Sequence, residues 1–142
     1  MSLSLAFRFV HVLAAVTWLG GMLFIALVLV PVARRLPDDA LRVRLISDLG
    51  RRFRTVGWIA IGVLVVTGLG NLWLRPELLG APRFHWKAGL IVLALALSVL
   101  HDFVLGPRAG AEPAARRRAS WVARANVLVV LAIVALGLAL RG

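Results

Sequence analysis

Apolar residues dominate four long stretches of the chain, and polar residues gather between them. The stretches run over about 7–30, 55–74, 88–106 and 121–140. Each is close to the ~20 residues that an α-helix needs to cross the ~30 Å hydrocarbon core of a bilayer. The pattern therefore predicts an all-α fold, an integral membrane four-helix bundle with up-down-up-down topology, in which residues 1–142 form a single transmembrane domain.

The composition is typical of a membrane protein. The chain has 142 residues, 61% of them hydrophobic, and its mean hydropathy is +0.93. The first stretch is too long for the apolar part of a signal peptide, and no cleavage site of small residues follows it, so we expect it to stay in the protein. The chain has no cysteine, which excludes disulfides and thiolate sites, and redox chemistry would need a cofactor.

Most basic residues lie in the short segments between the apolar stretches. The net charge is +11, and twelve of the seventeen Lys and Arg residues fall in the first and third segments, counted with the starts of the helices that follow. By the positive-inside rule these segments face the cytoplasm, so both termini lie outside a cytoplasmic (inner) membrane that the chain crosses several times. This distribution indicates contact with a lipid bilayer and no nucleic-acid binding.

The first basic segment opens with Pro37, Asp38 and Asp39, a turn with a helix cap. We expect residues 38–50 to form a short helix that lies on the membrane surface, where its arginines suit anionic lipid headgroups. A loose internal similarity also relates the two halves of the chain. A proline follows His11 by twenty residues and His85 by twenty-two, which is consistent with a duplicated hairpin.

Antiparallel threading groups the polar residues of the helices into two levels. His11, Asn71 at the end of the second stretch, and His85 at the start of the third share the outer level. His101 lies fourteen residues past Lys87, roughly 21 Å deeper at 1.5 Å per residue. A single haem iron takes two axial imidazoles, and these must lie at similar depth. His11 with His85 meets this requirement and His11 with His101 does not, so His11 and His85 are the candidate pair of haem ligands and His101 is less suited.

Other side chains complete this expected site. Lys87 is the anion partner of the haem propionates or an alternative ligand, and Trp18 and Asn71 are pocket residues. Plainer interpretations stand beside these: small residues of membrane helices mostly serve packing, tryptophans and arginines serve as interfacial anchors, and His85 and Lys87 near a boundary suit simple solvation. His11 is the strongest candidate, because an ionisable residue at the hydrocarbon level usually faces a partner or a cavity.

The third stretch carries a stripe of residues at helical spacing that joins the two levels. Its members are Lys87, Ile91, Ala94, Ser98 and His101. If this stripe faces the interior, it forms a polar track. His101 beside Asp102 is open to three interpretations: a proton relay, a second ligand site, or a structural pair that closes the helix onto Arg108, which we favour.

At these residues the chain resembles a known superfamily. The segment "FRFVHVLAAVTWLGGMLFIALVLVPVARR" is similar to the first helix of the copper-resistance D (CopD) family and of the HemJ-type protoporphyrinogen oxidases. The segment "RFHWKAGLIVLALALSVLHDF" is similar to the HemJ third helix, and "RANVLVVLAIV" resembles the start of its last helix. The similarity spans nearly the whole chain through short motifs on apolar helices.

The resemblance implies a four-helix membrane protein that binds haem b through His11 and performs one-electron redox chemistry. Oxidation of a porphyrin-like substrate, as by a HemJ-like oxidoreductase, is one form of this activity. The other matched positions are Lys87, His85 and Asn126. The HemJ pattern continues its asparagine with an acidic residue and a proline, where this chain has Val127 and Leu128, which argues against protoporphyrinogen oxidation itself.

Two alternatives remain open. The first is copper uptake or resistance, the function for which the CopD family is named. Cu(I) prefers thioether and thiolate ligands, of which the chain offers only Met1 and Met22, so a copper pathway would rest on three histidines at two depths. The second is a tightly packed helical module without haem, with a homodimer as an option. The sequence indicates no particular electron-transfer partner.

Overall fold

The computed structural model describes residues 3–139 and contains helices and no strand within them. Four helical segments there are long and apolar enough to cross a membrane: Leu3–Ala33, Asp39–Leu74, Pro82–Leu105 and Pro113–Leu138. Each predicted apolar stretch matches one of these segments, and residue 140 at the end of the last stretch lies outside the described residues. The prediction of an all-α chain with four membrane spans is therefore confirmed.

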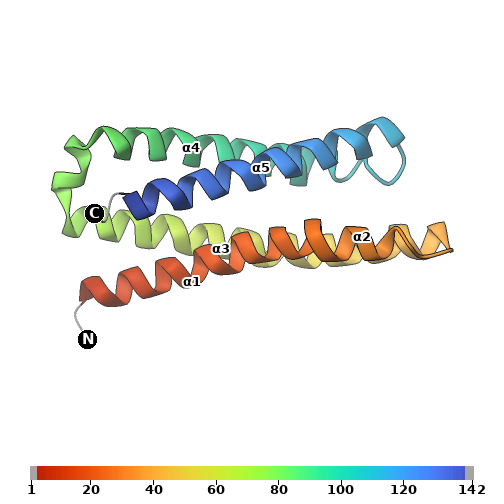
Figure 1. Ribbon diagram of the computed structural model, residues 1–142, viewed down its shortest axis with the longest axis horizontal. Coiled ribbons are helices and arrows are strands. Elements are labelled where there is room, and N and C mark those ends of the chain that lie inside the picture. Colours follow the sequence, from red (N-terminus) through yellow and green to blue (C-terminus); the bar gives the residue numbers. More distant parts are fainter. Residues whose placement is uncertain (1–2, 140–142) are drawn as a thin grey trace. The chain divides into compact units, whose positions relative to one another are not determined.

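The first of two compact units ends at Leu79 and is an antiparallel hairpin of two long helical segments (Figure 1). The first segment consists of α1 (Leu3–Phe24), the π-helix η1 (Ile25–Leu29) and α2 (Val30–Ala33). The second is α3 (Asp39–Leu74), which packs against α1 and α2.

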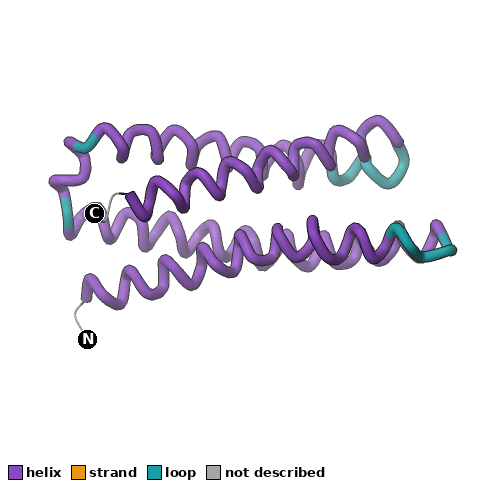
Figure 2. Tube along the Cα trace, in the orientation of Figure 1, coloured by secondary structure: helices purple, strands orange, loops and turns teal. Residues whose placement is uncertain are grey.

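The second unit begins at Gly80 and repeats this plan. Its first segment consists of α4 (Pro82–Val99) and the π-helix η3 (Leu100–Leu105), and α5 (Pro113–Ala139) returns antiparallel against it (Figure 2). A short 3₁₀ helix, η2 (Pro76–Gly80), connects α3 to α4 along the chain.

Small residues line the contact face of each hairpin. In the first hairpin Ala14 and Gly57 are buried, and in the second Ala94, Ala115 and Ala119 are. Small side chains let two helix backbones approach closely, and in lipid this close packing is what drives helices together.

Phenylalanine rings cover two glycines of the first hairpin. A Cβ atom added at Gly21 would overlap the ring of Phe53, and one added at Gly70 would lie 2.6 Å from Cε1 of Phe7. At these two positions the glycines therefore serve helix packing.

Each π-helix ends two residues before a proline. The backbone N–H of Val30 donates to the carbonyl oxygen of Ile25, five residues earlier, and that of Gly106 donates to His101 in the same way at 2.8 Å. Pro31 and Pro107 are the next residues. A proline ring clashes with the carbonyl group four residues before it in an α-helix, and the wider π turn relieves this crowding. The two hairpins therefore share a structural feature, a π-helix shortly before a proline, in addition to their sequence similarity.

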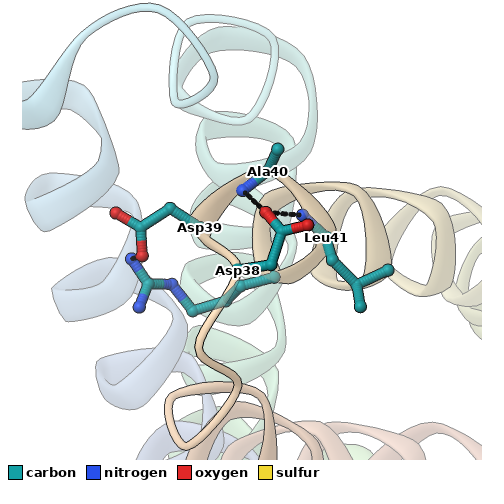
Figure 3. A network of polar contacts seen from close by, with 5 residues as sticks. Asp38, Asp39, Ala40 and Leu41 are labelled. Carbon is teal, nitrogen blue, oxygen red and sulfur yellow. Dashed lines mark hydrogen bonds and ion pairs between the residues drawn. The ribbon is translucent and has the colours of Figure 1, made fainter.

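Helix α3 begins at the predicted cap and continues past residue 50. The Asp38 carboxylate accepts hydrogen bonds from the backbone N–H groups of Ala40 at 2.8 Å and Leu41 at 3.2 Å (Figure 3). The helix then runs to Leu74 without a break, so the separate surface helix expected over 38–50 is instead the start of the second span. Gly50 costs only about 1 kcal/mol in a helix, which is too little to end it.

Candidate functional site

His11 lies on the face of α1 that packs against α3. Its Nδ1 is 2.8 Å from the hydroxyl oxygen of Thr67, and Thr67 is only 5% exposed. A Cβ atom added at Gly68 would lie 3.7 Å from Cε1 of His11, so the imidazole rests where α3 has no side chain. Within this hairpin the imidazole lies level with Thr67, about two turns before the end of α3.

The hydroxyl of Thr67 also bonds within its own helix. Its Oγ1 lies 2.6 Å from the backbone carbonyl oxygen of Val63, one turn earlier. Asn71 lies one turn later on α3 and is half-buried. These residues form a short polar strip on the face of α3 that meets His11.

The other two histidines also place Nδ1 beside an oxygen. His101 lies in η3, half-buried, with Nδ1 2.8 Å from the Asp102 carboxylate. His85 is exposed near the start of α4, with Nδ1 3.2 Å from the carbonyl oxygen of Ala81. Carbonyl and carboxylate oxygens only accept hydrogen bonds, so Nδ1 is the donor in both rings, and in the neutral form Nε2 carries the lone pair. The structure shows the contact of His101 with Asp102, and the choice among the three interpretations of His101 stays a prediction.

Trp18 and Lys87, two further residues of the expected haem site, each pack against the second helix of their own hairpin. Trp18 is buried on α1, and its Cδ1 lies 3.6 Å from the Cβ position of Gly57 on α3. Lys87 is half-buried on α4, with Nζ 3.3 Å from the Cβ position of Gly137 on α5.

The expected haem site therefore draws on residues of both hairpins and remains a prediction. His11, Trp18 and Asn71 belong to the first hairpin, and His85 and Lys87 to the second. In the part of the chain that the structure describes, no three His, Asp or Glu side chains gather as a metal cluster.

Sequence reasoning missed two polar pairs. Thr67 was not a candidate, although it is the only hydroxyl residue between 56 and 74 and lies opposite His11 in an antiparallel hairpin. Asn126 and Ser98 were named separately, and the structure joins them: Nδ2 of Asn126 donates to Oγ of Ser98 at 2.9 Å. Each of these three side chains is 5% exposed. The signal in each case is a polar residue inside an apolar helix, which must find a partner across the hairpin.

Comparison with known proteins points to one family. The family model of copper resistance protein D matches residues 47–140, a segment that holds every predicted site residue except His11 and Trp18. An uncharacterized protein of Aquifex aeolicus (strain VF5) is 34% identical over 138 residues, which cover 95% of this chain and 93% of that protein. No solved structure matches the chain.

Proposed function

The chain belongs to the copper resistance protein D (CopD) family, and on that premise we propose that it binds copper ions within the membrane and serves copper uptake or resistance. It is a multi-pass membrane protein, with four helices that can span a bilayer. The observation that carries the proposal is common to His11, His85 and His101, each of which holds Nδ1 within hydrogen-bond distance of an oxygen. Histidines that bind metals are oriented in this way, with the other ring nitrogen on the metal.

Imidazole nitrogens are the copper donors that this composition favours. The chain has no cysteine and two methionines, of which Met1 lies outside the described residues. Imidazole is a good ligand for copper, and Cu²⁺ heads the affinity order of divalent first-row metals at nitrogen sites. We therefore assign His11 as the copper ligand inside the membrane.

Copper would meet imidazoles at more than one depth. His85 and His101 lie at opposite ends of one helical segment, sixteen residues apart, which at 1.5 Å per residue is about 24 Å. We assign them as exchange sites near the two surfaces of the membrane.

Sidedness and assembly belong to the proposal as well. The basic segments favour an inner-membrane location with both termini outside. Alkaline phosphatase is active only outside the cytoplasm. Fused after residue 142, it is expected to be active. A fusion protein that is made in full amount but is inactive would show that the C-terminus faces the cytoplasm. A homodimer stays a prediction, tested by the mass of the detergent-solubilised protein.

The haem b hypothesis uses the same imidazole and ranks second. The name of the matched family refers to copper resistance, and neither the family model nor the Aquifex relative is described with haem. Haem bound by His11 and His85 with Lys87 beside it, together with the oxidoreductase activity that it would supply, remains a prediction from the sequence.

One preparation separates the two functions. Protein purified from cells that are supplied with both copper and a haem precursor is analysed for metal content and for its absorption spectrum. We expect copper to remain with the protein through purification and no Soret band to appear. If the protein contains no copper and shows a Soret band that sharpens on addition of dithionite, the chain binds haem and the copper proposal is wrong.

A further inference from the structure

Thr67 differs from the groups that hold the other two histidines. A carbonyl or a carboxylate oxygen can only accept, whereas a hydroxyl group can donate as well as accept. The short contact between His11 and Thr67 therefore does not by itself tell which ring nitrogen carries the proton.

A second hydrogen bond of Thr67 resolves this point. Its Oγ1 is 2.6 Å from the carbonyl oxygen of Val63, which has no hydrogen to give. The one hydroxyl hydrogen of Thr67 is thereby committed to Val63, and the oxygen can only accept from Nδ1 of His11, 2.8 Å away. In the neutral imidazole the proton is then on Nδ1 and the lone pair on Nε2.

The apolar surroundings of Thr67 stabilise this hydrogen-bonding arrangement of His11, Thr67 and Val63. Thr67 is 5% exposed on the contact face of the hairpin, and a polar group that loses its hydrogen-bond partner in an apolar environment has no water to replace it. Moving the proton to Nε2 would leave Nδ1 and the hydroxyl oxygen as two acceptors in contact as long as the hydroxyl keeps its bond to Val63. Turning the ring by 180° would place a C–H group, Cδ2, against the hydroxyl oxygen and lose the hydrogen bond.

We propose that Thr67 is the positioning residue that keeps the proton of His11 on Nδ1 and so makes Nε2 the copper-binding atom. The copper part of this statement rests on the proposed function, whereas the assignment of the proton does not. A partner of this kind fixes the orientation of a metal-binding imidazole and raises its basicity, and loss of the partner typically lowers metal affinity about 10- to 100-fold.

Two substitutions separate this role from plain packing. Thr67→Val keeps the shape of the side chain and removes the hydroxyl group, whereas Thr67→Ser keeps the hydroxyl group and removes the methyl group. The chain also offers a matched control: the hydroxyl of Thr17 donates to the carbonyl of Leu13, one turn earlier on α1, at 2.9 Å. Thr17→Val therefore removes the same kind of bond inside a helix at an exposed position.

The first measurement needs no copper. In protein labelled with ¹⁵N-histidine, the nitrogen chemical shifts distinguish protonated from unprotonated ring nitrogens, and the His11 signals are identified by their loss in His11→Ala. We expect Nδ1 to be protonated in the wild type, Thr67→Ser and Thr17→Val, and the proton to move toward Nε2 in Thr67→Val. A wild-type His11 with its proton on Nε2, or a Thr67→Val spectrum like that of the wild type, would overturn the assignment, and the wild-type result stands even if Thr67→Val does not fold.

The second measurement is the affinity of the same four proteins for Cu²⁺, set by competition with a chelator. We expect Thr67→Val to bind about 10- to 100-fold more weakly, and the other two variants to bind like the wild type. If the wild type binds no Cu²⁺ but the proton lies on Nδ1, the copper function fails and the proton assignment stands. If Thr67→Val binds copper as tightly as the wild type, Thr67 does not position the ligand although the copper function stands.

Discussion

The two hairpins are built alike and differ in the polar pair that each one buries. In both, a helical segment passes into a π-helix before a proline, a basic segment follows, and a long apolar helix returns. The first hairpin buries Thr67 against the imidazole of His11, whereas the second buries Ser98 against the amide of Asn126. A hydroxyl–amide pair can hold two helices together, but only the imidazole offers a nitrogen lone pair to a metal.

The register of the two hairpins sharpens this contrast. His11 and Lys87 each lie twenty residues before the proline of their hairpin, and each rests on a glycine of the returning helix, Gly68 and Gly137. The second hairpin thus has an ammonium group, which has no lone pair to bind a metal, where the first has an imidazole. One frame with two different polar groups at the same position is what we would expect of duplicated hairpins that have diverged.

The largest expected effect comes from removing the imidazole of the first hairpin. His11→Ala should weaken copper binding more than about 100-fold, because loss of a ligand should exceed the about 10- to 100-fold loss that follows removal of the group that orients it. Ser98→Ala in the second hairpin and Val12→Ala beside His11 should leave the affinity unchanged. Equal losses in His11→Ala and Ser98→Ala would erase the distinction between the hairpins.

A glycine covered by an aromatic ring gives the next largest effect, on stability. Gly21→Ala should lower the free energy of unfolding by about 1–3 kcal/mol, since the ring of Phe53 must move to admit the new methyl group. Gly89→Ala on α4 meets nothing within 4 Å, so it should not lower the free energy of unfolding and should raise it by at most about 1 kcal/mol, the cost of a glycine in a helix. Unfolding in mixed micelles with increasing dodecyl sulfate measures both, and a more harmful Gly89→Ala would contradict the packing described for the first hairpin.

The buried pair of the second hairpin should contribute less. A double-mutant cycle with Ser98→Ala and Asn126→Ala is expected to give a coupling energy of about 0.6 kcal/mol, the average for polar pairs between membrane helices. Copper affinity should be the same in all four proteins of the cycle. A change in affinity would show that the second hairpin takes part in the binding site through this pair.

The smallest effect is expected beside the imidazole itself. Gly68→Ala places a Cβ atom 3.7 Å from Cε1 of His11, an ordinary van der Waals distance. Copper affinity should therefore change by no more than about 0.5 kcal/mol, roughly twofold. A loss as large as that of His11→Ala would mean that copper or its pathway occupies the space over Gly68.

The four membrane spans could be predicted from the sequence because each one depends only on residues within its own segment. Runs of ~20 apolar residues specify membrane helices whatever their neighbours are, and Asp38 marks a helix start through bonds to the next residues. The continuation of α3 past Gly50 could not be predicted in the same way, because a single glycine weakens a helix without necessarily ending it.

The candidate site was readable in part. His11 stands out because an ionisable side chain in an apolar span needs a partner. Thr67 was not predicted, because a threonine in a membrane helix is not unusual in itself. Its role depends on its register with His11 across the hairpin and on its hydrogen bond to Val63. The pairing of His11 with His85 stays a prediction, because depth along a helix does not fix which helix faces which.

X-ray absorption at the copper edge tests the central claim most directly, namely that Nε2 of His11 binds copper. In the copper-loaded wild type we expect the outer-shell scattering that an imidazole ligand produces, with nitrogen as a nearest neighbour of the metal. The same protein with His11→Ala should lose that contribution, while His101→Ala and His85→Ala keep it. An imidazole signal that survives His11→Ala at full strength would contradict the account.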